Sequence, residues 1–364
     1  MHKTSAWPLA FAYAALIAYA SLYPFSGWRD QGIAPWAFLA APWSPYWTGF
    51  DVFTNVLGYV PLGALLALAL LRSGRARAAV PGAALAGALL ALVLECLQSY
   101  LPARVPSNVD LALNAAGALG GALLAALLER LGAIDRWSRL RARWFVADAG
   151  GALALLALWP AALLFPAAVP FGLGQVLERL EDGLADLLED TPFLEWLPIR
   201  DVELQPLVPL AELLCVMLGV LIPCLLAYGI ARTWLRRVLC AAGVIGVGVA
   251  ATTLSAALSY GPAHAWEWLD TPVRAGVWAA LALAALCLPV PRRGCAALLL
   301  LALAVQLSML NQSSADVYFA QTLQTWEQGR FIRFHGLGQW LGWVWPYAVL
   351  VYVLLRFSRR ERDN

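Results

Sequence analysis

Long apolar stretches, separated by short charged segments, follow one another along the whole chain. A helix rises about 1.5 Å per residue and must cross roughly 30 Å of hydrocarbon, so each membrane span needs about 20 mostly apolar residues. The stretches that approach this length are 7–23, 53–71, 78–100, 111–128, 144–169, 207–231, 238–260, 273–288, 295–310 and 339–355. This pattern predicts an all-α protein, a polytopic integral membrane helix bundle with about ten transmembrane helices.

Composition and charge strengthen this interpretation and add an orientation. The 364 residues are 61% hydrophobic and only 13% charged, which is too apolar for a soluble globular protein of ordinary surface chemistry. Lysine and arginine in short loops are retained on the cytoplasmic side during insertion. Most of the 25 lysines and arginines fall at the amino terminus, in alternate loops and in the carboxyl-terminal tail. Both termini are therefore predicted to be cytoplasmic.

A long segment at about 170–206 divides the predicted spans into two groups of five. Its leucines recur at helical spacing opposite a face of acidic residues. One interpretation is a helix lying in the outer interface, and the alternative is a lid that docks a partner or repels substrate. We predict a four-helix transmembrane domain over 1–143, a fifth span with an outward amphipathic segment over 144–206, and a five-helix transmembrane domain over 207–364.

The second, third and fourth predicted spans carry polar side chains, which are costly in hydrocarbon unless they have partners or a function. Those of the second span lie at i, i+4 and i+8 and share one helix face, and the third and fourth spans each add a polar pair. The alternation of spans places these residues, with an arginine from the loop between spans three and four, in one leaflet. The candidate pocket comprises Asp51, Asn55, Tyr59, Glu95, Gln98, Arg104, Asp110 and Asn114.

The spacing of these residues resembles the pattern of VanZ-like membrane proteins, a family named for a glycopeptide-resistance accessory. The resemblance covers about 20–130 and rests on Asp51-x3-Asn55-x3-Tyr59-Val60-Pro61-Leu62-Gly63, Glu95-x2-Gln98, Arg104 and Ser107-x2-Asp110-x3-Asn114-x2-Gly117. Asn55 stands where many members have histidine. The resemblance implies a multi-pass protein of the bacterial cytoplasmic (inner) membrane and, for the founding member, reduced susceptibility to teicoplanin-type antibiotics. The second half looks like the extension carried by longer members.

Several interpretations of the polar cluster stay open at this stage. Its acids and arginine could form a buried network that fixes helix register, with Asp110 capping its helix. The leading functional hypothesis is an outward-facing pocket for the polar head of a membrane lipid or a lipid-linked cell-envelope precursor, in which Arg104 grips a phosphate or carboxylate. The alternatives are a membrane enzyme that uses Glu95 or Asp51 as general acid/base, and a transporter. The sequence contains no recognisable nucleophile or metal motif.

A second polar cluster precedes the last predicted span. Arg330, Arg333 and His335 form a candidate anion site, for which an interfacial aromatic belt is the alternative explanation. The six cysteines show no CxxC or His/Cys pattern, so no disulfide framework, metal or other cofactor is expected. Nucleic-acid binding is disfavoured, because the arginines form short clusters beside spans that membrane insertion already explains. Protein partners are unknown from the sequence.

Overall fold

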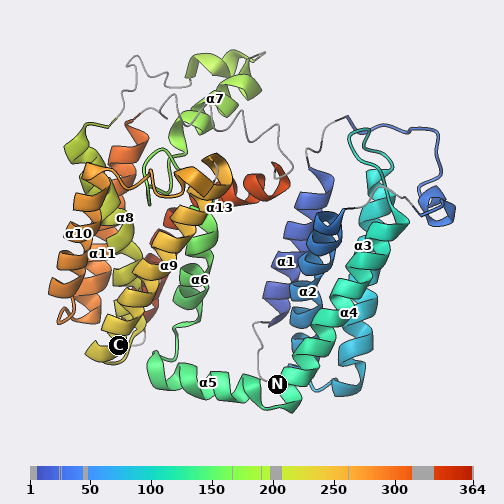
Figure 1. Ribbon diagram of the computed structural model, residues 1–364, viewed down its shortest axis with the longest axis horizontal. Coiled ribbons are helices and arrows are strands. Elements are labelled where there is room, and N and C mark those ends of the chain that lie inside the picture. The colour runs from blue at the N-terminus through green and yellow to red at the C-terminus, as the bar shows by residue number, and fades with distance from the viewer. Residues whose placement is uncertain are drawn as a thin grey trace. The chain divides into compact units, whose positions relative to one another are not determined.

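The protein is described here by a computed structural model that covers residues 6–23, 25, 27–43, 48–165, 167–189, 191–196, 207–260, 262–313 and 332–362. Every regular element in these ranges is a helix, apart from one isolated β-bridge between Phe145 and Ala231. The predicted all-α class is therefore confirmed. The chain divides into two compact units, Met1–Leu140 and Arg141–Asn364 (Figure 1).

The first unit is a bundle of helices that run alternately up and down (Figure 1). Its long helices are α1 (Ala6–Leu22), α2 (Gly49–Arg72), α3 (Ala79–Gln98) and α4 (Asn108–Arg130). As a result, α2 and α4 begin at the same end of the bundle at which α1 and α3 end. The long connection between α1 and α2 contains the short helix η1 (Ala37–Ala40) and packs against this end of the bundle, where Gln31 donates a hydrogen bond to the carbonyl oxygen of Ser99 at 2.7 Å.

Glycines let α2 and α4 pack backbone against backbone, as small residues commonly do in membrane helices. A methyl group added at Gly117 would lie 2.3 Å from the carbonyl oxygen of Val56, and one added at Gly121 would lie 1.9 Å from that of Val60. On the facing helix, a methyl group at Gly63 would likewise overlap the α4 backbone. The register of α2 on α4 therefore depends on positions that accept no side chain.

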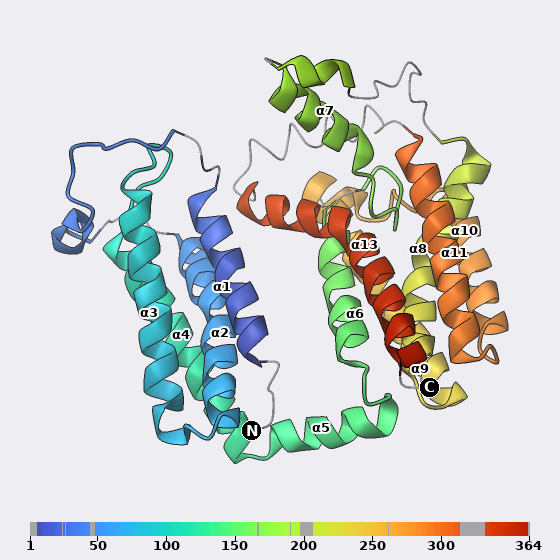
Figure 2. The same cartoon turned by 180° about the vertical axis from the view of Figure 1, so that it is seen from behind.

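The second unit is built around α8 (Pro209–Ile230), most of whose residues are buried. Around it pack α6 (Gly150–Leu163), α9 (Trp234–Tyr260), α10 (Thr271–Leu286) and α11 (Arg292–Asn311). The helix α13 (Ile332–Arg362) runs along α6 (Figure 2). The amphipathic helix α7 (Leu177–Leu188) lies within the segment predicted to be amphipathic. The residues just before Leu177 form a coil and are not part of this helix.

Six described helices are long and apolar enough to cross a membrane, namely Asp51–Arg72, Ala76–Gln98, Asn108–Arg130, Pro209–Ile230, Trp234–Ser259 and Arg292–Asn311. The apolar helices α1, α6 and α10 are shorter. Each predicted span overlaps one of these nine helices or α13. The number of about ten crossings and the cytoplasmic location of both termini stay predictions.

The fifth predicted span differs most from the structure. A helix is predicted over 144–169, but α6 contains only 14 residues, a length of about 21 Å, and the apolar sequence continues as a buried coil up to α7. Pro170 is one reason that no helix extends through 169, because proline lacks a backbone N–H and disfavours helical conformation in the residue before it. The arginine-rich loop predicted before this span contains an additional helix, α5 (Ala133–Trp144).

Candidate functional site

The residues of the predicted pocket all lie at the end of the first unit where α2 and α4 begin and α3 ends (Figure 1). A hydrogen bond between α2 and α4 joins Asn55 to Asp110, whose Oδ1 accepts from the Asn55 Nδ2 at 3.0 Å. Tyr59, one turn after Asn55, is 5% exposed, and Glu95 of α3 accepts a hydrogen bond from the Ser107 N–H at the start of α4. The structure therefore brings polar side chains from three helices together.

Glu95 is the buried acid of this cluster, with 4% of its surface exposed. Its Oε2 accepts a hydrogen bond from the backbone N–H of Ser107 at 2.8 Å, which ties the end of α3 to the start of α4. Ser107, rather than Asp110, is the N-cap of α4, and its Oγ accepts from the Asp110 N–H at 3.2 Å. In a complete capping box the side chain at the Asp110 position would bind the N–H of the cap. Glu95 takes that role from a neighbouring helix, and the Asp110 carboxylate instead accepts from Asn55.

Asp51 provides the contrast at the start of α2, where the capping box is complete. The Asp51 Oδ2 accepts from the backbone N–H of Thr48 at 2.9 Å and from the Thr48 hydroxyl at 2.7 Å. In return, the Thr48 Oγ1 accepts from the Asp51 N–H at 3.2 Å. A negative charge here also complements the helix dipole. Asp51 therefore stabilises the start of its own helix, one turn before Asn55.

Asn114 is the residue of the cluster whose hydrogen bonding is incomplete. It lies one turn after Asp110, is 7% exposed, and its Oδ1 has no hydrogen-bond partner among the described residues. A buried polar atom left in this state costs about 1–3 kcal/mol, and the large majority of such atoms in folded proteins are paired. This amide therefore marks a position where an incoming donor would be stabilised.

Arg104 and Gln98 have a structural role in this cluster, because both side chains donate hydrogen bonds to carbonyl oxygens at the end of α1. The Arg104 Nε donates to the carbonyl oxygen of Tyr23 at 3.0 Å, its Nη2 also donates to that oxygen, and Nη2 lies 3.4 Å from the carbonyl oxygen of Ala20. Gln98 Nε2 donates to the carbonyl oxygen of Ser21 at 3.1 Å. The last carbonyls of a helix lack partners within the helix and carry partial negative charge. These side chains therefore fasten α1 to α3 and to the loop after it.

Replacing Arg104 with alanine is expected to lower the free energy of unfolding by about 2 kcal/mol, because charge-assisted hydrogen bonds to the end of α1 are lost. The measurement is thermal unfolding of the purified protein in detergent. Arg75→Ala is the matched control, since it removes an exposed guanidinium outside this cluster. If both variants unfold at the wild-type temperature, Arg104 does not hold α1.

Arg330 of the second predicted site lies outside the described residues. Arg333 and His335 fall in the first turns of α13, but their side chains also lie outside the described part. The predicted anion site therefore stays a prediction. Two buried amides of α11, Gln306 and Asn311, were not predicted as site residues, although uncharged amides in an apolar span often join helices.

The secondary structure of the described residues is helical and includes six helices suited to crossing a bilayer, which makes this a multi-pass membrane protein. Residues 4–129 match the family model VanZ/LLP1. Residues 4–129 thus form a VanZ-like region, as the spacing of the polar residues indicated, and the match ends before the second unit begins at Arg141. No curated protein and no solved structure matches the chain significantly.

Proposed function

We propose that the VanZ-like region binds the polar head of a membrane lipid or of a lipid-linked cell-envelope precursor at the end where α2 and α4 begin. The observation that carries this proposal is the Asn114 Oδ1, a buried acceptor without a hydrogen-bond partner among the described residues. It lies one helical turn from Asp110, which already joins α2 to α4 through Asn55. A buried amide oxygen without a partner lowers the stability of the unliganded protein, so a purely structural role does not account for it.

The chemistry of the cluster selects the class of ligand. Asp51, Glu95 and Asp110 are acceptors when ionised, and the Asn114 Oδ1 adds a further acceptor. An acceptor-rich site favours a ligand rich in N–H and O–H groups, such as an amine, an amino sugar or a peptide amide. Low dielectric surroundings strengthen such bonds. Holding a precursor in this way would contribute to resistance against teicoplanin-type antibiotics, in a bacterial inner membrane.

Replacing Asn114 with leucine tests the proposal, because leucine has a similar shape but no acceptor. The unliganded variant is expected to be as stable as the wild type or more stable, since an unsatisfied polar atom is removed. Its affinity for lipid II, an amino-sugar and peptide-bearing envelope precursor, is expected to fall about tenfold, the value of one buried hydrogen bond. Both quantities are measured on the full chain in nanodiscs, by thermal unfolding and by binding of labelled lipid II.

The matched control is Asn108→Ala, which removes an amide from the first turn of the same helix. Asn108 is bonded to the carbonyl oxygen of Ala41 and lies outside the predicted pocket. Its variant is expected to bind lipid II as the wild type does. Unchanged binding by a stable Asn114→Leu protein would contradict the proposed site. Chemical conversion of lipid II by the wild type would instead favour the enzyme hypothesis, with Glu95 as the acid/base.

A further inference from the structure

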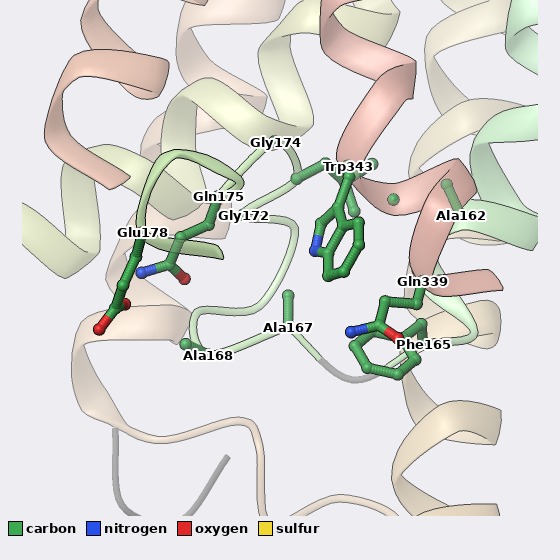
Figure 3. A pocket seen from close by; sticks show the side chains of 12 residues that line it. Ala162, Phe165, Ala167, Ala168, Gly172, Gly174, Gln175, Glu178, Gln339 and Trp343 are labelled. Carbon is green, nitrogen blue, oxygen red and sulfur yellow. The ribbon is translucent and has the colours of Figure 1, made fainter. Parts of the chain in front are cut away.

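A cleft in the second unit lies against the buried coil that connects α6 to α7 (Figure 3). Alanines and glycines of the coil and of α6 form much of its surface, and Phe165 and Trp343 contribute aromatic rings. Its polar residues are Gln175, Glu178 and Gln339. Sequence patterns did not predict this cleft, because the coil was assigned to the fifth span and to the segment after it.

The coil is held in place by side chains from helices far along the chain. Gln306 Nε2 donates to the carbonyl oxygen of Phe171 at 3.3 Å, and Asn311 Nδ2 donates to that of Gly174 at 3.0 Å. The Tyr347 hydroxyl donates to the same Gly174 oxygen at 3.1 Å. Non-helical backbone in a membrane protein is tolerated only where it is buried in protein or lines a cavity. This coil meets both conditions.

The conformation of the coil also indicates a purpose beyond connecting two helices. Phe171 has φ +62°, an uncommon value for a bulky residue, and it is 2% exposed. Gly174 has φ +96°, and a methyl group there would lie 2.5 Å from the Leu307 side chain. Positive φ is open to glycine, but at a residue such as Phe171 it costs about 1–3 kcal/mol, and such strain concentrates at ligand sites and switch regions. The strained Phe171 directly precedes Gly172, which with Gly174 forms part of the cleft surface.

The polar groups of the cleft lie on opposite sides of it and differ in character. Gln175 and Glu178 occupy one side, and Gln339 lies with Phe165 and Trp343 on the other (Figure 3). The buried Gln339 Nε2 is a donor with no hydrogen-bond partner among the described residues. Glu178 alone is charged among the described residues that line the cleft. One side therefore attracts a cation, and the other offers a hydrogen bond to an anionic or ester oxygen.

We propose that this cleft binds the headgroup of an amine-bearing phospholipid. The ammonium group pairs with the Glu178 carboxylate, and a phosphate or ester oxygen accepts a hydrogen bond from Gln339 Nε2. The glycerol backbone and the first methylene groups pack against Phe165 and Trp343, since aromatic side chains favour the headgroup level of a bilayer. The assignment rests on the second unit alone and is independent of the ligand proposed for the VanZ-like region.

The test uses the full-length protein from nanodiscs that contain equal amounts of phosphatidylethanolamine and phosphatidylglycerol. Lipids retained after transfer to detergent are quantified by native mass spectrometry. We expect the wild type to retain phosphatidylethanolamine preferentially, and Glu178→Gln to reduce this preference about tenfold, as for one charge-assisted hydrogen bond. Gln339→Leu is expected to reduce it as well, without loss of thermal stability, because its unsatisfied donor is removed.

The control variants separate this site from general charge effects and from the first unit. Asp186→Asn removes one exposed negative charge from the same helix as Glu178 and should leave the preference unchanged. Asn114→Leu should also leave it unchanged. Equal retention of both lipids by the wild type would overturn the proposal, as would equal effects of Glu178→Gln and Asp186→Asn. Stabilisation by free phosphoethanolamine as strong as that by the lipid would overturn the assignment to a phospholipid.

Discussion

Replacing Gly121 with alanine is expected to lower the free energy of unfolding by about 3 kcal/mol, because the new methyl group meets backbone that cannot yield as a side chain would. It would lie 1.9 Å from the carbonyl oxygen of Val60 and 3.0 Å from the backbone nitrogen of Ala64. Relief requires α2 and α4 to move apart, which also lengthens the hydrogen bond between Asn55 and Asp110. The measurement is the midpoint of thermal unfolding in detergent, followed by lipid II binding.

The adjacent glycine supplies the control. A methyl group at Gly120 meets nothing within 4 Å, and alanine is the better helix former. Gly120→Ala is therefore expected to leave stability unchanged or to raise it by about 0.5 kcal/mol. Gly121→Ala should thus lower the free energy of unfolding, whereas Gly120→Ala should not. Similar unfolding temperatures for the two variants would show that α2 and α4 do not pack through Gly121.

Replacing Asn311 with leucine is expected to lower the free energy of unfolding by about 2 to 4 kcal/mol, because backbone groups at the start of α7 lose their acceptor. The Asn311 Oδ1 accepts from the N–H groups of Val176 and Leu177 at 2.9 and 3.0 Å. Its Nδ2 donates to the carbonyl oxygens of Gly174 and Leu307. Leucine preserves the volume and removes all of these bonds. Hydrogen exchange at Val176 and Leu177 should accelerate along with the fall in thermal stability.

Gln312→Leu is the matched control for this substitution. Gln312 follows Asn311 in the chain, but its side chain is exposed and donates only to the Ser308 hydroxyl at 3.2 Å within the same helix. Its replacement is expected to change stability by less than about 0.5 kcal/mol. If the Asn311 variant retains wild-type stability and slow exchange at the start of α7, the amide does not hold the coil. The cleft beside it would then lack its proposed support.

The residues predicted to form a pocket lie at one end of the first unit, but several of them have partners other than those expected. Arg104, expected to grip a phosphate, instead donates to the carbonyl oxygens at the end of α1. Glu95, expected as an acid/base or an ion-pair partner, accepts from the N–H of Ser107. Asn55, Asp110 and Asn114 remain the best candidates for binding a ligand, because the Asn114 Oδ1 has no hydrogen-bond partner among the described residues. The proposed headgroup site therefore rests on amide and carboxylate acceptors, not on the arginine.

The second unit shows where an apolar stretch is a weak guide to a helix. The sequence around Phe165 and Phe171 is apolar, so a prediction from hydrophobicity alone extends the fifth span toward it. The helix ends at Leu163 all the same, and distant amides satisfy the backbone of the coil that follows. Prolines signal the break locally, and hydrogen bonds from Gln306, Asn311 and Tyr347 satisfy backbone groups of the buried chain after it.

The sequence by itself determined the helical class, the approximate bounds of most long helices and the VanZ-like region. These depend on hydrophobic length and on polar spacing within one helix, which are local properties of the chain. Tertiary structure alone decided that Glu95 completes the cap of α4, that Arg104 binds α1, and that a cleft adjoins the coil before α7. Such roles depend on which donors and acceptors meet across helices, and a hydrogen bond such as that from Arg104 to the carbonyl oxygen of Tyr23, two residues far apart in the chain, leaves no periodic trace in the sequence.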